Sequence, residues 1–181
     1  MFRRAGEMGL NVLTAMLTQS LEEAAAKIAI YREARARSGY DPAAGVVTMM
    51  IHTFVGADQD TVLDTVRRPL CNYLKSHVAL IETGARSLGI QVMGEALEKH
   101  LDDLASFAFE RYYRTASLIG TPQHCIAMVE RLSAIGVNEA ACLIDFGVAA
   151  DTVLDGLSFL AELKDAVRQV PAQALPRRAG A

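Results

Sequence analysis

The sequence is poor in cysteine and lacks tryptophan altogether. Its three cysteines, Cys71, Cys125 and Cys142, are odd in number and widely spaced among 181 residues. Because no CxxC pair occurs, we expect neither a disulfide framework nor a zinc site built on cysteine. Reduced thiols are typical of cytoplasmic proteins, so we expect a cytoplasmic location.

An excess of charge of one sign and long apolar runs are also missing. The chain holds 18 Lys and Arg against 21 Asp and Glu, a net charge of −3. This balance argues against nucleic-acid binding through a broad basic field. No uninterrupted apolar run approaches the ~18–20 residues that cross a bilayer, so we expect no membrane segment. Glu7, Gly9 and Asn11 interrupt what would be the apolar region of a signal peptide.

Metal and phosphate motifs are absent as well. The four histidines form no HxxxH or HExxH pair, and we expect no metal site. Gly84, Gly89 and Gly94 are not followed by Gly-Lys-Ser/Thr, so they form no P-loop.

What the chain does contain is a large share of hydrophobic residues, 51% of the total. That share excludes disorder for most of the chain, and the length fits one domain with a sizeable core. We expect this domain to cover residues 1–170. Pro171 and the Pro176-Arg177-Arg178 segment indicate a flexible tail over 171–181.

Three apolar runs predict buried strands, at residues 11–17, 46–55 and 140–146. Each run is apolar at both alternating positions, which is typical of a parallel sheet covered by helices. Helical signals lie between them. Ser20 and Glu23 form a capping box, and Thr121-Pro122 predicts the start of a helix that ends near Gly136.

Two further helical segments complete the pattern. Asp151 is expected to cap a final helix whose leucines, from Leu154 to Leu163, face inward. Residues 58–113 show helical patterning alone, more than a plain crossover between strands needs, so we predict a helical insertion there. The alternation of strands and helices favours an α/β fold, either a doubly wound sheet or a (β/α)₈ barrel.

Four segments, in order along the chain, carry a family resemblance: AGEMGLNVLT from Ala5, YREAR from Tyr31 with GYDP from Gly39, VTMMIHTFVG from Val47 with RPLCNYL from Arg68, and LIGTPQHCI from Leu118. These segments resemble the luciferase-like flavin monooxygenases, the family of bacterial luciferase and alkanesulfonate monooxygenase. The Val47 and Arg68 segments look like the branch found beside natural-product assembly lines.

The resemblance implies a (β/α)₈ barrel that binds FMN, reduced by a separate flavin reductase. It also implies that reduced flavin activates dioxygen to oxygenate a small-molecule or carrier-bound substrate. A complete barrel takes about 250 residues, so the resemblance implies the C-terminal part only, with about the last three strand–helix units. The chain is then a truncated reading frame, a remnant or one partner of a split protein, and Met1 need not be the true start.

Chemistry in such barrels sits at the carboxyl ends of the strands. The resemblance aligns the first predicted strand with a wall of the flavin ring pocket. The interpretation as ordinary core residues stays open for Val12 and Leu13 in particular. The candidate cofactor-binding residues are Val12, Leu13, Thr14, Met16 and Gln19.

The second and third predicted strands supply the remaining candidates. His52 is the candidate catalytic residue, because a neutral imidazole can transfer a proton near neutral pH; a satisfied core histidine is the alternative. The candidate substrate residues are Thr53, Phe54, Asp145 and Phe146. Asp145 could instead pair with a helix N-terminus, Arg111 or Arg114.

Two segments have a second interpretation. Residues 58–113 correspond to a mobile lid in the family, yet here they could simply cover an open barrel side. Gly120-Thr121-Pro122 could hold an anion, although a helix cap is the simpler interpretation. At the level of the whole chain, the alternative to an enzyme is a non-catalytic module. Open strand edges would drive either its homo-oligomerisation or its pairing with a missing N-terminal half.

Overall fold

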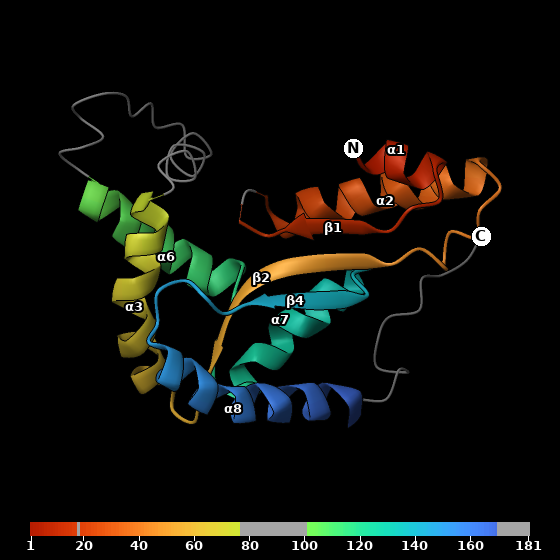
Figure 1. Cartoon of the computed structure of the whole chain (residues 1–181). Coiled ribbons are helices and arrows are strands. Elements are labelled where there is room, and N and C mark those ends of the chain that lie inside the picture. Colours follow the sequence, from red (N-terminus) through yellow and green to blue (C-terminus); the bar gives the residue numbers. More distant parts are fainter. Residues whose placement is uncertain (18, 77–100, 170–181) are drawn as a thin grey trace.

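The computed structural model describes residues 1–17, 19–76 and 101–169, and Figure 1 labels the elements. Helices and strands alternate along most of the chain, which confirms the predicted α/β class. In chain order the elements are α1 (Phe2–Glu7), β1 (Val12–Ala15), α2 (Leu21–Arg37), β2 (Val47–Val55), α3 (Gln59–Ser76), α6 (Leu101–Thr115), β3 (Leu118–Gly120), α7 (Pro122–Ala134), β4 (Glu139–Leu143) and α8 (Ala150–Gln169).

The strand β2 is the centre of a parallel sheet. β1 pairs with Val47–Met50, β4 pairs with Thr48–His52, and β3 pairs with Thr53–Val55. The Val12 amide donates to the Val46 carbonyl, while the Asn138 amide donates to the Val47 carbonyl, both at 2.9 Å. Because successive carbonyls of a strand point to opposite sides, β1 and β4 lie along opposite edges of β2.

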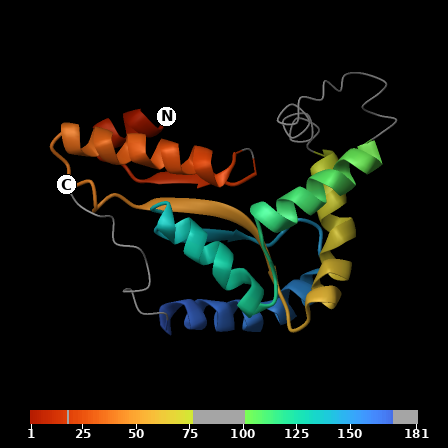
Figure 2. The same ribbon diagram turned by 180° about the vertical axis from the view of Figure 1, so that it is seen from behind.

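Helices cover one face of this sheet. Figures 1 and 2, which view the molecule from opposite sides, show α2 and α7 on the same side of the strands. Val47, Met49 and Ile51 point toward that side and are fully buried. Thr48 and Met50 point to the other face, where Figure 1 shows no helix of the described residues lying across the sheet. His52, further along β2 on that face, is covered by α3 and α6.

Side chains at the amino ends of the strands tie the layers together. Arg32, on α2, donates to the Pro42 carbonyl at 2.7 Å and to Asn138 Oδ1 at 2.9 Å. The same Asn138 oxygen accepts the Val47 amide at 2.9 Å. This cluster holds the loops that enter β2 and β4 against α2.

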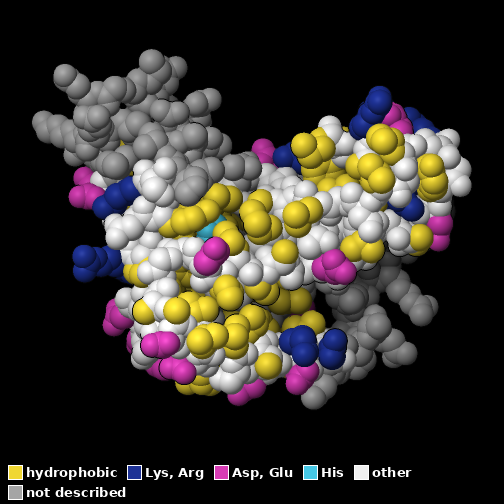
Figure 3. All heavy atoms as spheres, viewed as in Figure 1, with side chains coloured by type: hydrophobic (Ala, Val, Ile, Leu, Met, Phe, Trp, Pro, Cys, Tyr) yellow, Lys and Arg dark blue, Asp and Glu magenta, His cyan; other side chains and the backbone are white. Residues whose placement is uncertain are grey.

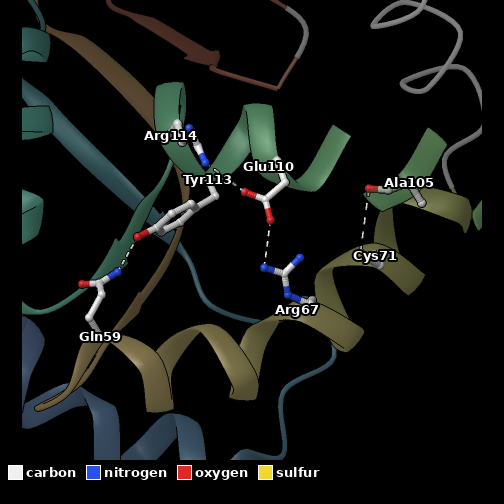
Figure 4. A network of polar contacts seen from close by, with 7 residues as sticks. All are labelled: Gln59, Arg67, Cys71, Ala105, Glu110, Tyr113 and Arg114. Atoms are coloured by element: carbon white, nitrogen blue, oxygen red, sulfur yellow. Dashed lines mark hydrogen bonds and ion pairs between the residues drawn. The ribbon is translucent and has the colours of Figure 1, made fainter. Parts of the chain in front are cut away.

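The predicted insertion is helical where the structure describes it. α3 and α6 pack side by side, with an ion pair of 2.8 Å between Arg67 and Glu110. The Arg67 guanidinium also lies 4.5 Å from the centre of the Phe109 ring. Figure 4 shows this contact region between the two helices. The glycines predicted to divide the insertion, Gly84, Gly89 and Gly94, lie outside the described residues.

Two expectations about the C-terminal region need correction. The third predicted strand, β4, ends at Leu143 and does not reach Asp145 or Phe146. In α8, Leu163 is buried as predicted, but Leu154 is 62% exposed and Leu157 is also exposed. One side of α8 packs against α7 and the end of β2. The leucines extend around the helix beyond this covered side, so some of them face solvent.

Among the helices of the described residues, none combines the length and the apolar character needed to cross a membrane. The three cysteines are free: Cys125 is buried, and Cys71 and Cys142 are half-buried. The predicted tail, 171–181, lies outside the described part of the chain.

Candidate functional site at the carboxyl ends of the strands

His52 is enclosed by aromatic rings that come from three separate parts of the chain. Its side chain is 2% exposed. The Tyr73, Tyr112 and Phe146 rings meet the imidazole edge-on, with centroids at 4.9, 5.3 and 5.5 Å. These rings belong to α3, α6 and the segment after β4. The helical insertion and the segment after the last strand therefore both pack on His52.

A hydrogen bond fixes the orientation of this imidazole. Nδ1 of His52 lies 2.9 Å from the Tyr112 hydroxyl oxygen. Burial raises the pKa of Tyr112 well above its ordinary value, although a hydrogen bond with the His52 backbone opposes the shift. The phenol therefore stays neutral, and we assign it as the donor to Nδ1, with the imidazole proton on Nε2. This environment fits a histidine packed into the core, with Nδ1 in a hydrogen bond.

Of the four candidate substrate residues, three lie in the core. Thr53 is buried, and its hydroxyl donates to the Ile51 carbonyl at 3.0 Å. Phe54 and Phe146 are buried as well, and Phe146 alone of the four contacts the His52 ring through an aromatic pair. Asp145 is exposed to solvent. The predicted third strand is not buried: β4 is exposed at its start and half-buried afterwards, and water solvates the carboxylate that follows it.

The candidate flavin residues of β1 divide between the two faces of the sheet. Val12 and Met16 are buried in the hydrophobic core on the face that α2 covers. Leu13 points the other way and is 66% exposed. Side chains alternate between the two faces along a strand. Leu13 therefore lies on the uncovered face, whereas Val12 and Met16 lie on the covered one. Val12 and Met16 thus occupy core positions, the alternative left open for Val12.

Thr14 and Gln19 are joined in one hydrogen-bonded group after β1. Gln19 Nε2 donates to Thr14 Oγ1 at 3.0 Å and to the Ala15 carbonyl at 2.7 Å. Lys27, on α2, completes the group by donating to Gln19 Oε1 at 2.9 Å. Sequence reasoning missed Lys27, because a lysine on a helix gives no local sign of a partner eight residues earlier. The flavin-contact role of Thr14 and Gln19 remains a prediction.

A second polar group lies at the start of α7. Thr121 Oγ1 accepts the His124 amide at 3.2 Å, which confirms the predicted cap. The Thr121 amide donates to Gln59 Oε1 at 3.1 Å, and Gln59 Nε2 donates to the Tyr113 hydroxyl at 2.5 Å. Figure 4 shows Gln59 and Tyr113 pointing toward each other. These contacts use the N–H groups of Thr121 and His124, so we assign this segment to helix capping.

A groove opens where β2 ends, between the start of α3 and α8. Its volume is about 270 Å³, and its walls include Phe54, Phe159 and Asp155. Asp58, at its rim, accepts the Thr61 amide and hydroxyl at 2.9 and 2.8 Å. Those hydrogen bonds lower the pKa of Asp58, so this carboxylate serves as the cap of α3.

The fold and the site together define an α/β protein built on part of a parallel barrel. The model of the family described as luciferase-like monooxygenase matches residues 1–139. The chain belongs to the luciferase-like monooxygenase family. No significant match was found among curated proteins.

Solved structures show the same fold. The monooxygenase RslO1 from Streptomyces bottropensis has a TM-score of 0.58 and 16% identity, over 89% of this chain and 43% of its own. An F420-dependent secondary alcohol dehydrogenase, solved with an F420-acetone adduct, has a TM-score of 0.60 and 19% identity over 93% and 46%.

A third similar structure is the oxygenating constituent of 3,6-diketocamphane monooxygenase from the CAM plasmid of Pseudomonas putida, in complex with FMN. Its TM-score is 0.53 and its identity 16%, over 97% of this chain and 46% of its own. The chain thus spans less than half the length of each of the three structures. The predicted fold class, a portion of a (β/α)₈ barrel, is confirmed.

Proposed function

We propose that this chain is the C-terminal part of an FMN-dependent monooxygenase, which activates dioxygen at reduced flavin to oxygenate an organic substrate. The observation that carries the proposal is the family match over residues 1–139. It is supported by parallel strands whose carboxyl ends meet the helical insertion, where barrel enzymes hold their chemistry.

The residues of the uncovered sheet face fit one wall of a flavin site. Leu13, in the middle of β1, offers an exposed apolar side chain. Met50, on the neighbouring strand β2, lies on the same face of the sheet. An apolar wall suits an isoalloxazine ring because it excludes water. Thr14 and Gln19, with Lys27, would supply polar contacts at the carboxyl end of β1. Bound reduced flavin would supply the electrons for oxygen reduction.

His52 and the insertion have supporting roles in this proposal. His52 would hold a proton at Nε2 near the substrate, with its orientation fixed by Tyr112. The helices α3 and α6 would exclude water from the site. We further propose a cytoplasmic location, a small-molecule or carrier-bound substrate and a separate flavin reductase. The rest of the site would come from an N-terminal half or another copy of the chain.

A cofactor titration tests the proposal. FMN, and separately F420, are added to the purified chain while flavin fluorescence is followed. We expect saturable binding of FMN that is tighter than that of F420. Leu13→Asp should weaken it, whereas Leu154→Asp, an equally exposed leucine on α8, should not. A folded chain that binds neither cofactor would contradict the flavin-wall role, and tighter binding of F420 would contradict FMN as the cofactor.

A second candidate function is a non-catalytic, oligomeric module. The observation that favours it is the span of this chain, less than half of each similar structure. A stable, folded oligomer that binds no flavin would support this alternative.

A further inference from the structure

The sheet has two open edges in the part of the chain that the structure describes. β1 and β4 each pair with β2, along its opposite edges, and neither has a second partner strand among these residues. The outer edges of β1 and β4 therefore present backbone N–H and C=O groups that another strand can pair with. Because all pairs are parallel, both open edges run in the same direction.

The uncovered face between these edges is largely apolar. Pairing places Leu13, Thr48 and Glu139 in one row across the sheet, and Ala15, Met50 and Ala141 in a parallel row. Thr48 Oγ1 donates to Glu139 Oε2 at 2.7 Å, which makes the first row polar at one end. Figure 3 shows hydrophobic side chains gathered over the middle of this side of the molecule.

Leu13 is the clearest sign that this face is incomplete. It lies inside a strand, yet it is 66% exposed. Contiguous apolar surface of this kind marks interaction sites. A partner that covers Leu13 should also form hydrogen bonds with the backbone groups at the open edges of β1 and β4.

Length and symmetry favour a second copy of this chain as the partner. This chain corresponds to 43–46% of each similar barrel protein, so two copies amount to 86–92% of one. A two-fold axis parallel to the strands would bring β4 of each copy beside β1 of the other. Both new strand pairs would be parallel, and both open edges of each copy would be used. We propose that a second copy of this chain packs on the uncovered face, through the edges of β1 and β4.

The inference rests on the partial barrel and is tested in the absence of flavin, because Leu13 also belongs to the proposed flavin wall. Sedimentation velocity of the purified chain over a range of concentrations should show a dimer. Leu13→Lys places a charge at the centre of the interface and should raise the dissociation constant by about tenfold or more. Leu154→Lys, on an exposed part of α8 outside that interface, should leave the dissociation constant unchanged.

A second measurement uses the unmodified chain, so its result does not depend on whether a variant folds. Hydrogen exchange of the β1 and β4 amides should slow as the concentration rises through the dissociation constant, while amides of α8 should not respond. A monomeric chain would overturn the inference. So would a dimer that Leu154→Lys disrupts and Leu13→Lys does not, or one whose β1 and β4 amides exchange at a rate independent of concentration.

Discussion

Nδ1 of His52 lies 2.9 Å from the hydroxyl oxygen of Tyr112, and this contact joins the central strand of the sheet to the helical insertion. The two residues are 60 positions apart in the sequence. Through this pair, any movement of α6 changes the surroundings of His52, which rings from α3, α6 and the segment after β4 enclose. The position and orientation of His52 therefore depend on the insertion being in place.

Tyr112→Phe should change the tautomer of His52. Without the phenol O–H, Nδ1 loses its donor, and the preference for a proton on Nε2 weakens. We expect a loss of about 1–3 kcal/mol in the free energy of unfolding, the cost of an unsatisfied buried acceptor. Nitrogen NMR of the imidazole reports the tautomer, and urea unfolding reports the stability. Tyr113→Phe is the matched control, because its hydroxyl contacts Gln59 and not His52. An unchanged tautomer in Tyr112→Phe would contradict the assignment.

His52→Ala should destabilise the chain because three aromatic rings lose their common neighbour. A cavity of that size in a core costs about 2–4 kcal/mol, to be measured by urea unfolding. Activity of an enzyme with a complete barrel separates the two roles of the residue. A loss of turnover in a variant that keeps its melting temperature, such as His52→Gln, would support proton transfer. Full turnover in that variant would leave His52 as a core residue.

The cap of α3 should make stability depend on pH in acid. Thr61 lowers the pKa of Asp58 in the folded chain relative to the unfolded chain. The contribution of Asp58 is therefore fully present above the unfolded pKa and is lost as pH falls through the lower, folded value. Urea unfolding at neutral pH and at a pH below about 4 measures it.

Two variants check the assignment to Asp58. Asp58→Asn should reduce the acid-dependent loss of stability, because the amide does not titrate. Thr61→Val keeps the backbone hydrogen bond and removes the hydroxyl one, so its effect should be intermediate. Equal acid sensitivity in all three proteins would show that Asp58 does not contribute.

Cys125 should resist alkylation in the folded chain. Burial, with a smaller effect of Cys142, raises the pKa of the Cys125 thiol to about 12. The reactive thiolate is then scarce at pH 8. Labelling with iodoacetamide, mapped by mass spectrometry, should proceed more slowly at Cys125 than at the half-buried Cys142, and the difference should vanish in denaturant. Equal rates in the folded protein would contradict the buried position.

Local patterns in the sequence predicted most of the elements. The capping box of Ser20 and Glu23 is present, with the Glu23 amide 3.2 Å from Ser20 Oγ and the Ser20 amide 2.9 Å from Glu23 Oε2. The strands β1, β2 and β4 were predicted as apolar runs. The three residues of β3 are too few for a period to show, so that strand was missed.

The candidate site was less accessible to prediction. An apolar run does not say which of its faces is covered, and Leu13 and Val12 therefore looked equivalent although they lie on opposite faces. His52 was recognised as a candidate, but the ring of aromatic residues around it was not. Tyr73, Tyr112 and Phe146 reach it from distant parts of the chain, and no spacing in the sequence links them.

The position of β2 at the centre of the sheet implies an order of folding. Contacts between the entrances of β1 and β2 join residues 35 positions apart, whereas those between β2 and β4 join residues 91 apart. Closing the longer loop costs about 1 kcal/mol more in chain entropy, so the β1–α2–β2 unit gains its contacts first. On the ribosome that unit is also synthesised first. Until β4 arrives, the second edge of β2 is open to the wrong strand, and this interval is when a nascent chain is most in need of a chaperone.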